Sequence, residues 1–118
     1  LKFDCFDVLI FYDYRSFEQF NINLSTYEKK YLIAWSLGVY VCNYYYSKFK
    51  DFNGFTAING TTKPIDDNYG IPVNAYNLTV DNFNEFTCKK FIKKIGANIE
   101  IIRSIQDLKN ELISIKNL

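Results

Sequence analysis

The densest group of chemically active side chains in this sequence is basic. Four ammonium groups fall within six residues, on Lys89, Lys90, Lys93 and Lys94. Such a cluster can neutralise phosphate groups, and Phe86 and Phe91 lie close enough in sequence to stack on nucleic-acid bases. The same pattern is typical of a solvated basic edge that discourages strand pairing. A phosphate-binding site and a solvated edge are therefore the two interpretations of this segment.

Catalytic chemistry is not expected from the other reactive residues. The chain contains no histidine, which leaves a serine or cysteine nucleophile without its usual base. Its cysteines, Cys5, Cys42 and Cys88, form no C-x-x-C pair and are predicted to be buried free thiols. Asp66 and Asp67 are typical of a solvated turn, and no glycine-rich phosphate loop occurs. We predict no catalytic residue, no metal and no cofactor. An enzyme with an unrecognised site is kept as a third hypothesis, after the two that are given below.

The composition bounds both the partners and the origin of the chain. The formal net charge is only +1, which is no basic footprint for an independent nucleic-acid binder. Aromatic residues make up 19% of the chain and need a large core or covering partners. Methionine is absent, and residues with AT-rich codons supply about half of the 118 positions. This bias predicts an organelle-encoded protein of the mitochondrial matrix, with Leu1 either a non-standard start or a processed end.

Hydrophobic periodicity predicts five regular elements in the order β-α-β-β-α: a strand over 3–13, a helix over 25–52, a strand over 55–58, a strand over 91–103 and a helix from Ser104. Ser25 and Glu28 form a capping box for the first helix, and Asp107 lies at the third position after the Ser104 cap. Residues 87–90 are expected to form a helical turn.

The element order predicts an α+β fold of the ferredoxin-like split βαβ type. It has a long first helix, an extended arm over 59–81 and no last strand, all in one domain over 1–118. Residues 75–80 of the arm are expected to form a strand-like return. A strand from another chain added at the open sheet edge stays a prediction of this fold.

Several blocks of the sequence resemble the small-subunit ribosomal protein S-ten family. Residues 12–19 resemble its F-D-x-R-x-I-D-Q segment, and residues 54–60 resemble G-x-x-V-x-G-P. Residues 83–91 are similar to V-N-K-x-[AS]-R-x-Q-[FY], and residues 99–102 are similar to L-[VI]-D-I. The blocks follow the family's order, although the proline-rich segment of the family's arm is replaced after Gly60.

The resemblance implies a structural constituent of the mitochondrial small ribosomal subunit, located in its head and without catalysis. The implied partners are ribosomal RNA and adjacent head ribosomal proteins, with no small-molecule substrate and no membrane. The RNA contacts would be the four clustered lysines, Lys89, Lys90, Lys93 and Lys94, followed by Arg15 and Lys63. The protein contacts would be Trp35, Tyr46 and Phe49.

A second hypothesis is a small accessory subunit of a mitochondrial inner-membrane complex, held by the apolar segment 31–46. A helix that spans a bilayer needs about 20 apolar residues. The uncharged run here has sixteen residues and is interrupted by Ser36, Gly38 and Asn43. A buried helix is therefore favoured over a membrane span.

Overall fold

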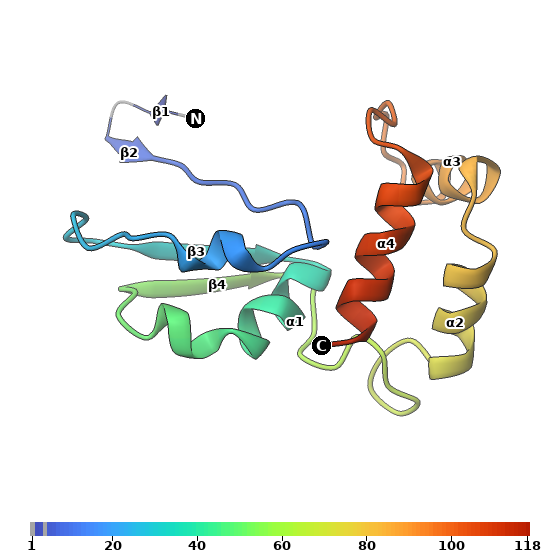
Figure 1. Ribbon diagram of the computed structural model, residues 1–118, viewed down its shortest axis with the longest axis horizontal. Helices are drawn as coiled ribbons and strands as arrows, with labels where there is room; N and C mark the ends of the chain where they lie inside the picture. The colour runs from blue at the N-terminus through green and yellow to red at the C-terminus, as the bar shows by residue number, and fades with distance from the viewer. Residues whose placement is uncertain (1, 4) are drawn as a thin grey trace.

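The protein combines a strand-containing region with a group of helices at one end (Figure 1). The computed structural model describes residues 2–3 and 5–118. Near the amino terminus, β1 (Lys2–Phe3) and β2 (Phe6–Asp7) pair antiparallel. The described part of the chain is thus α+β, with only short strands.

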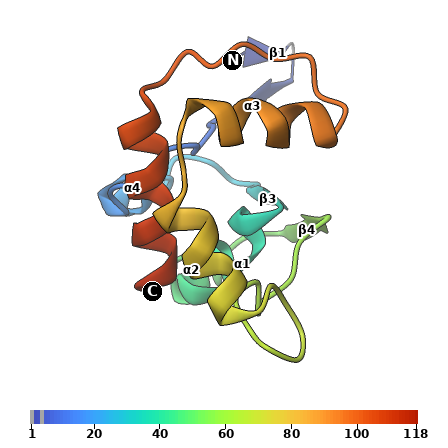
Figure 2. The same ribbon diagram turned by 90° about the vertical axis from the view of Figure 1, so that its right-hand side faces the viewer.

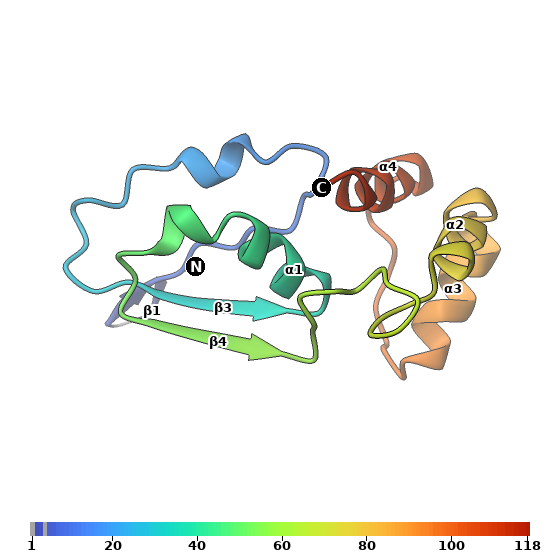
Figure 3. The same cartoon turned by 90° about the horizontal axis from the view of Figure 1, so that it is seen from below.

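The central unit is a strand, a helix and a second, parallel strand. β3 (Tyr31–Trp35) runs directly into α1 (Leu37–Tyr44), and η2 (Tyr46–Phe49) leads back to β4 (Gly54–Ile58). The two strands are in register from the pair Tyr31–Gly54 to the pair Trp35–Ile58. Figure 3 shows α1 beside this two-stranded sheet, with both strands pointing toward the helical end of the molecule.

Burial alternates along β3 as expected for a strand that is covered on one face. Ala34 is buried and Leu32 packs against the core. Tyr31, Ile33 and Trp35 are exposed on the other face. The period of two explains why these residues form a strand although they lie within a longer apolar run.

The helical group consists of α2 (Val73–Asp81), α3 (Glu85–Lys94) and α4 (Ile105–Lys116), which gather together in two perpendicular views (Figures 1 and 2). Tyr76 of α2 donates its hydroxyl proton to the carbonyl of Leu112 in α4 at 2.9 Å. α3 begins at a capping box in which Asn84 and Thr87 each satisfy a backbone amide of the other.

A small aromatic-rich core joins the two regions. Its buried members are Phe20, Val41, Phe49 and Ile115. The centre of the Phe20 ring lies 5.3 Å from that of Tyr45 and 5.7 Å from that of Phe49. The core therefore accounts for part of the high aromatic content of the chain. Ile115 comes from α4 and is 1% exposed, so the last helix is anchored in the core of the strand-containing region.

Two sequence predictions about local structure are confirmed. The strand expected over 55–58 is β4. The helix expected from Ser104 is α4, and the Ser104 hydroxyl accepts a hydrogen bond from the Asp107 amide at 3.0 Å. Both elements carry a strong local signal, an alternating apolar run in one case and a side-chain cap in the other.

The predictions for the first half of the chain are partly wrong. The helix over 25–52 is replaced by β3, α1 and η2, because an abrupt change of backbone conformation at Ser36 ends the strand within the apolar run. The strand over 3–13 is limited to β1 and β2, and residues 8–13 have no regular structure. The position of Asp4 lies outside the described residues.

The predictions for the second half also need correction. The strand-like return over 75–80 lies within α2, and the helical turn over 87–90 is part of the longer α3. The strand over 91–103 is replaced by the end of α3 and an irregular segment from residue 97. Here the capping box at Asn84 favours a helix, and this local signal outweighs the alternation of apolar residues.

The ferredoxin-like arrangement, the division into one domain and the open edge for a partner strand stay predictions. Within the described residues, no helix is both long and apolar enough to cross a membrane. The segment 31–46 that was considered for such a span is divided between a strand and a short helix.

Candidate active site

The most unusual backbone in the described part of the chain is at Ser36, between β3 and α1. Its φ is 54° and its ψ is −126°. A side-chain-bearing residue in this region of conformational space costs about 1–3 kcal/mol, and such strain is concentrated at functional sites. Ser36 and Asn59 are the two non-glycine residues with positive φ among those described.

The residues around Ser36 read A-W-S-L-G, from Ala34 to Gly38. This differs in its first position from the G-x-S-x-G elbow, in which a serine sits on a strained turn between a strand and a helix and is presented as a nucleophile. Here too a strand, β3, comes before the strained serine, and a helix, α1, follows it. Sequence reasoning missed this residue because it placed 31–46 in one helix, whereas the Ser-x-Gly spacing was the available signal.

Close packing explains why the last residue of this segment, Gly38, is a glycine. A Cβ at Gly38 would lie 3.0 Å from the hydroxyl oxygen of Tyr14, which closely approaches the start of α1. Gly38 is buried and Tyr14 is half-buried. Glycine therefore lets the segment before η1 (Glu18–Asn21) pack against the first turn of the helix that follows Ser36.

Ser36 is available for chemistry. The residue is exposed, and its hydroxyl makes no capping hydrogen bond at the start of α1. The amides of Leu37 and Gly38 lie in the first turn of a helix, where backbone N–H groups have no intrahelical acceptor. These amides and the positive end of the helix dipole favour an anion next to the serine.

β4 holds the other side of the elbow. The Ser36 amide donates to the carbonyl of Ile58 at 2.9 Å, which extends the pairing of the two strands by one residue. A Cβ at Gly60 would lie 2.4 Å from the Ser36 carbonyl oxygen and 2.3 Å from a methyl carbon of Val39. The chain after β4 thus passes so close to the elbow that only glycine fits.

An ion-pair network ties the segment before the elbow to α4. The Arg15 guanidinium contacts Asp13 at 2.6 Å and Asp107 at 2.5 Å. Arg103 pairs with Glu111 and lies 3.6 Å from Asp13. The hydrogen bonds from Arg15 hold the pKa of the Asp13 carboxyl well below its usual value, whereas burial raises the pKa of the Glu111 carboxyl. This network joins residues 13–15 to α4 and to Arg103 just before it.

The usual base for a serine nucleophile is missing, and two titratable side chains in or near α1 do not replace it. Histidine is absent from the sequence. Burial raises the pKa values of the Tyr14 phenol and the Cys42 thiol, so both stay protonated near neutral pH. Among the described residues, no group of three metal-ligating side chains could hold a metal ion either. The elbow therefore presents an exposed hydroxyl next to backbone amides that have no intrahelical acceptor.

The four clustered lysines all lie on α3, whereas Lys93 and Lys94 were predicted to lie on a strand. Lys89 pairs with Glu85 one turn earlier at 2.5 Å, and this pairing lowers the pKa of the Glu85 carboxyl. The other three, Lys90, Lys93 and Lys94, are exposed and have no ion-pair partner within the described chain. α3 therefore presents unpaired positive charge to solvent.

The remaining predicted contact residues do not gather at one place. Arg15 is engaged by Asp13 and Asp107, and the Lys63 ammonium lies over the Tyr69 ring at 5.1 Å from its centroid. Trp35 and Tyr46 are exposed, by 65% and 53%. Phe49 is 5% exposed and belongs to the core.

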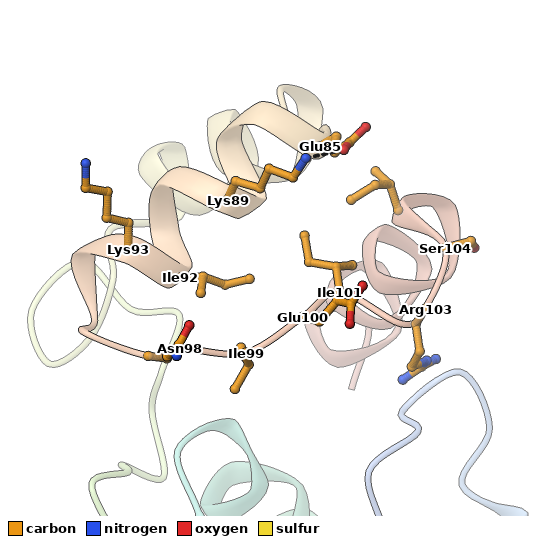
Figure 4. A pocket seen from close by; sticks show the side chains of 12 residues that line it. Glu85, Lys89, Ile92, Lys93, Asn98, Ile99, Glu100, Ile101, Arg103 and Ser104 are labelled. Atoms are coloured by element: carbon orange, nitrogen blue, oxygen red, sulfur yellow. Dashed lines mark hydrogen bonds and ion pairs between the residues drawn. The ribbon is translucent and has the colours of Figure 1, made fainter.

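A groove of about 930 Å³ lies between α3 and the irregular segment before α4 (Figure 4). Ile92 and Ile101 point into it, and Lys89 reaches toward Glu85 along its rim. Its lining residues belong to segment 85–105, and none comes from β3, α1 or β4. The hollow and the elbow are thus formed by different elements.

Comparison with known proteins gives a consistent result. The family described as pimeloyl-ACP methyl esterase BioG matches residues 2–115. A malonyl-[acyl-carrier protein] O-methyltransferase of Bacteroides fragilis is 39% identical over 92% of this chain, and an uncharacterised protein of Haemophilus influenzae is 38% identical over 75%. The crystal structure of BioG from Haemophilus influenzae superposes with a TM-score of 0.73, at 30% identity over 90% of this chain.

These relatives are longer than the matched region. The chain spans 24% of the Bacteroides protein, 40% of the uncharacterised Haemophilus protein and 52% of the solved BioG chain. The similarity therefore covers nearly all of the present sequence but only part of each relative.

The comparisons contradict the functional predictions made from the sequence. The matched family is not a ribosomal one, so the S-ten resemblance, the structural role in a ribosomal subunit and the partnership with ribosomal RNA and head proteins are wrong. The prediction of no enzyme is wrong as well, because the family is described as esterases. The alternative function, a subunit of an inner-membrane complex, is contradicted by the same family match. The S-ten blocks were short and rich in common residues, and they passed over the A-W-S-L-G segment.

Proposed function

Because this chain belongs to the family of BioG pimeloyl-ACP methyl esterases, we propose that it carries the nucleophile of a carboxylic ester hydrolase. The substrate class is the methyl ester of an acyl chain held on acyl-carrier protein. The observation that carries the proposal is the strained, exposed Ser36 between β3 and α1. This geometry is that of a serine elbow, in which the strained turn presents the hydroxyl to a substrate.

In the proposed reaction the Ser36 hydroxyl oxygen attacks the ester carbonyl carbon and its proton passes to a base. The Leu37 amide, the residue after the nucleophile, donates to the oxyanion that forms. The C–O bond to the methoxy group then breaks, and methanol leaves with the proton returned by the base. Water cleaves the acyl-serine in the same manner and releases the free carboxylate and the serine hydroxyl.

The histidine base that such a reaction uses is not found among these 118 residues. The chain contains no histidine, and it spans 52% of the solved BioG chain. Serine elbows take their base from a histidine that follows much later in the sequence.

The unpaired lysines of α3 are proposed to contact the carrier. Lys90, Lys93 and Lys94 present positive charge on the helical group toward which the carboxyl ends of β3 and β4 point (Figures 1 and 3). An anionic carrier would be steered by these charges, and such steering weakens as salt is added. Charge reversal at Lys93 should raise KM and leave kcat nearly unchanged.

Esterase chemistry is favoured over methyl transfer, although one relative is named as a methyltransferase. That protein is about four times longer than the region matched here. A methyltransferase needs a site for its methyl donor, whereas the feature of these residues that can perform chemistry is a nucleophilic serine. We therefore propose ester cleavage for the matched region.

The test is hydrolysis of pimeloyl-ACP methyl ester by the protein at its natural length, followed by mass spectrometry of the acyl carrier. Ser36→Ala should lower kcat by about 10⁴-fold or more, because the covalent route is lost. Thr56→Ala on the exposed part of β4 is the matched control and should retain activity. Hydrolysis that persists in Ser36→Ala, or no hydrolysis by the unmodified protein, would refute the proposal.

A further inference from the structure

A second polar side chain, that of Asn59, is placed next to Ser36 by the strand register. β3 and β4 are parallel, and Trp35 is paired with Ile58. Ser36 and Asn59 each follow one member of this last pair, and the Ser36 amide bonds to the Ile58 carbonyl at 2.9 Å. Since neighbouring strands lie about 4.8 Å apart, a group bound at Ser36 is also within reach of a side chain at residue 59.

The backbone of Asn59 is held in place by the elbow itself. Its φ is 47°, a left-handed conformation that asparagine tolerates better than most residues. The next residue, Gly60, is pressed against the Ser36 carbonyl and Val39. The chain must therefore turn sharply at residue 59, and the position of the Asn59 side chain is coupled to that of the serine.

A role in the turn explains the backbone conformation of Asn59 but gives no function to its side-chain amide. Asparagine and aspartate in turns usually bond to backbone groups nearby. Elsewhere in this chain Asn23 accepts from the Ser25 amide at 3.0 Å, and Asp66 accepts from the Asn68 and Tyr69 amides at 2.9 Å each. Asn59 is exposed, and its side chain has no hydrogen-bond partner within the described residues.

We propose that the Asn59 side-chain amide contacts the substrate ester and donates a hydrogen bond to its carbonyl oxygen as that oxygen becomes negative. It would act together with the Leu37 amide. An amide NH₂ has two donors and no proton to lose, so it can stabilise an oxyanion without changing protonation state. This inference rests on the proposed esterase function and adds a residue to it.

The experiment compares Asn59→Gly with the unmodified protein at its natural length, using the same methyl ester assay. Glycine adopts positive φ without strain, so this variant removes the amide and keeps the turn. We expect kcat to fall about 100- to 1000-fold, with KM nearly unchanged and the melting temperature equal or higher. Asn59→Asp, which keeps the shape and replaces the NH₂ donor by an anionic oxygen, should lower kcat at least as much.

Asn68→Gly is the matched control, since it removes another exposed asparagine whose side chain has no partner, far from the elbow in sequence. It should keep the kcat of the unmodified protein. If Asn59→Gly keeps kcat within about threefold while Ser36→Ala is inactive, the role of Asn59 is refuted and the esterase proposal stands. If the unmodified protein shows no hydrolysis, the esterase proposal itself fails.

Discussion

The elbow region and the helical group of this protein are stabilised in different ways. Around Ser36 an unfavourable backbone is held by close packing, with Gly60 against the elbow and Val41 fully buried beneath it. α3 and α4 instead begin at side-chain caps and carry surface ion pairs. Strained conformations persist only where the surroundings over-determine them. We therefore expect packing changes at the elbow to affect both stability and activity, and changes at the caps and ion pairs of the helical group to affect mainly stability.

The largest expected effect tests whether the two regions are coupled. Ile115 lies on α4 but is 1% exposed in the core that contains Val41. Ile115→Ala should lower the free energy of unfolding by about 3 kcal/mol, through lost burial and a residual cavity. The transition seen by far-ultraviolet circular dichroism and that seen by fluorescence of Trp35, the single tryptophan of the chain, should shift together.

Ile113→Ala on the same helix provides the control. Ile113 is 38% exposed, so its removal should cost less than about 1 kcal/mol. If Ile115→Ala shifts only the helical signal and leaves the Trp35 transition in place, the two regions unfold separately and the coupling is wrong.

A smaller effect is expected when a methyl group is added to a glycine, and it should be greater at the elbow than at a glycine elsewhere in the chain. Gly60→Ala introduces a Cβ 2.4 Å from the Ser36 carbonyl oxygen, so the backbone must shift. We expect a loss of about 2 kcal/mol from overpacking and a marked loss of ester hydrolysis. Thermal unfolding and the methyl ester assay measure the two effects.

Gly96→Ala is the comparison. Gly96 has a φ of 69° but open space around its Cα, so alanine should cost about 1 kcal/mol from backbone strain alone and leave hydrolysis unchanged. Equal losses of activity in the two variants would show that close packing at the elbow has no special importance for catalysis.

Local signals in the sequence explain which parts of the fold could be predicted. The cap at Ser104 and the apolar run of β4 lie within the elements that they specify, and both predictions are confirmed. The prediction of one helix over 25–52 was wrong because the strand β3 and the helix α1 form one continuous apolar run. The boundary between them is marked only by the backbone conformation of Ser36. The irregular segment from residue 97 alternates as a strand does but has no strand to pair with among the described residues.

The candidate site was hidden for a related reason. A serine elbow is specified by a conformational change at one residue, and Ser36 was interpreted only as an interruption of an apolar helix. The absence of histidine strengthened that interpretation, since a serine without a base suggests no catalysis. The positive φ values of Ser36 and Asn59 cannot be derived from composition or periodicity. The organellar origin inferred from codon bias stays a prediction.

The smallest expected effect concerns the ion pairs between the two regions, whose carboxyls should respond to pH in opposite directions. Arg15 holds the pKa of Asp13 below its ordinary 3.8, so the stability from this group is present above that value and is lost as the pH falls below it. Burial holds the pKa of Glu111 above its ordinary 4.5. Protonated Glu111 therefore favours the folded state, and this stability is lost as the pH rises from 4.5 through the folded-state value.

Each contribution can be removed separately in denaturant unfolding measured from acidic to neutral pH. Glu111→Gln should abolish the fall in stability just above pH 4.5, while Asp13→Asn should abolish the loss below pH 3.8. Both changes should be modest, since Asp13 is one-third exposed and its ion pair is screened by solvent. An unchanged slope above pH 4.5 in Glu111→Gln would mean that this carboxyl keeps its ordinary pKa. Added salt should weaken the Arg15–Asp107 ion pair in both variants alike.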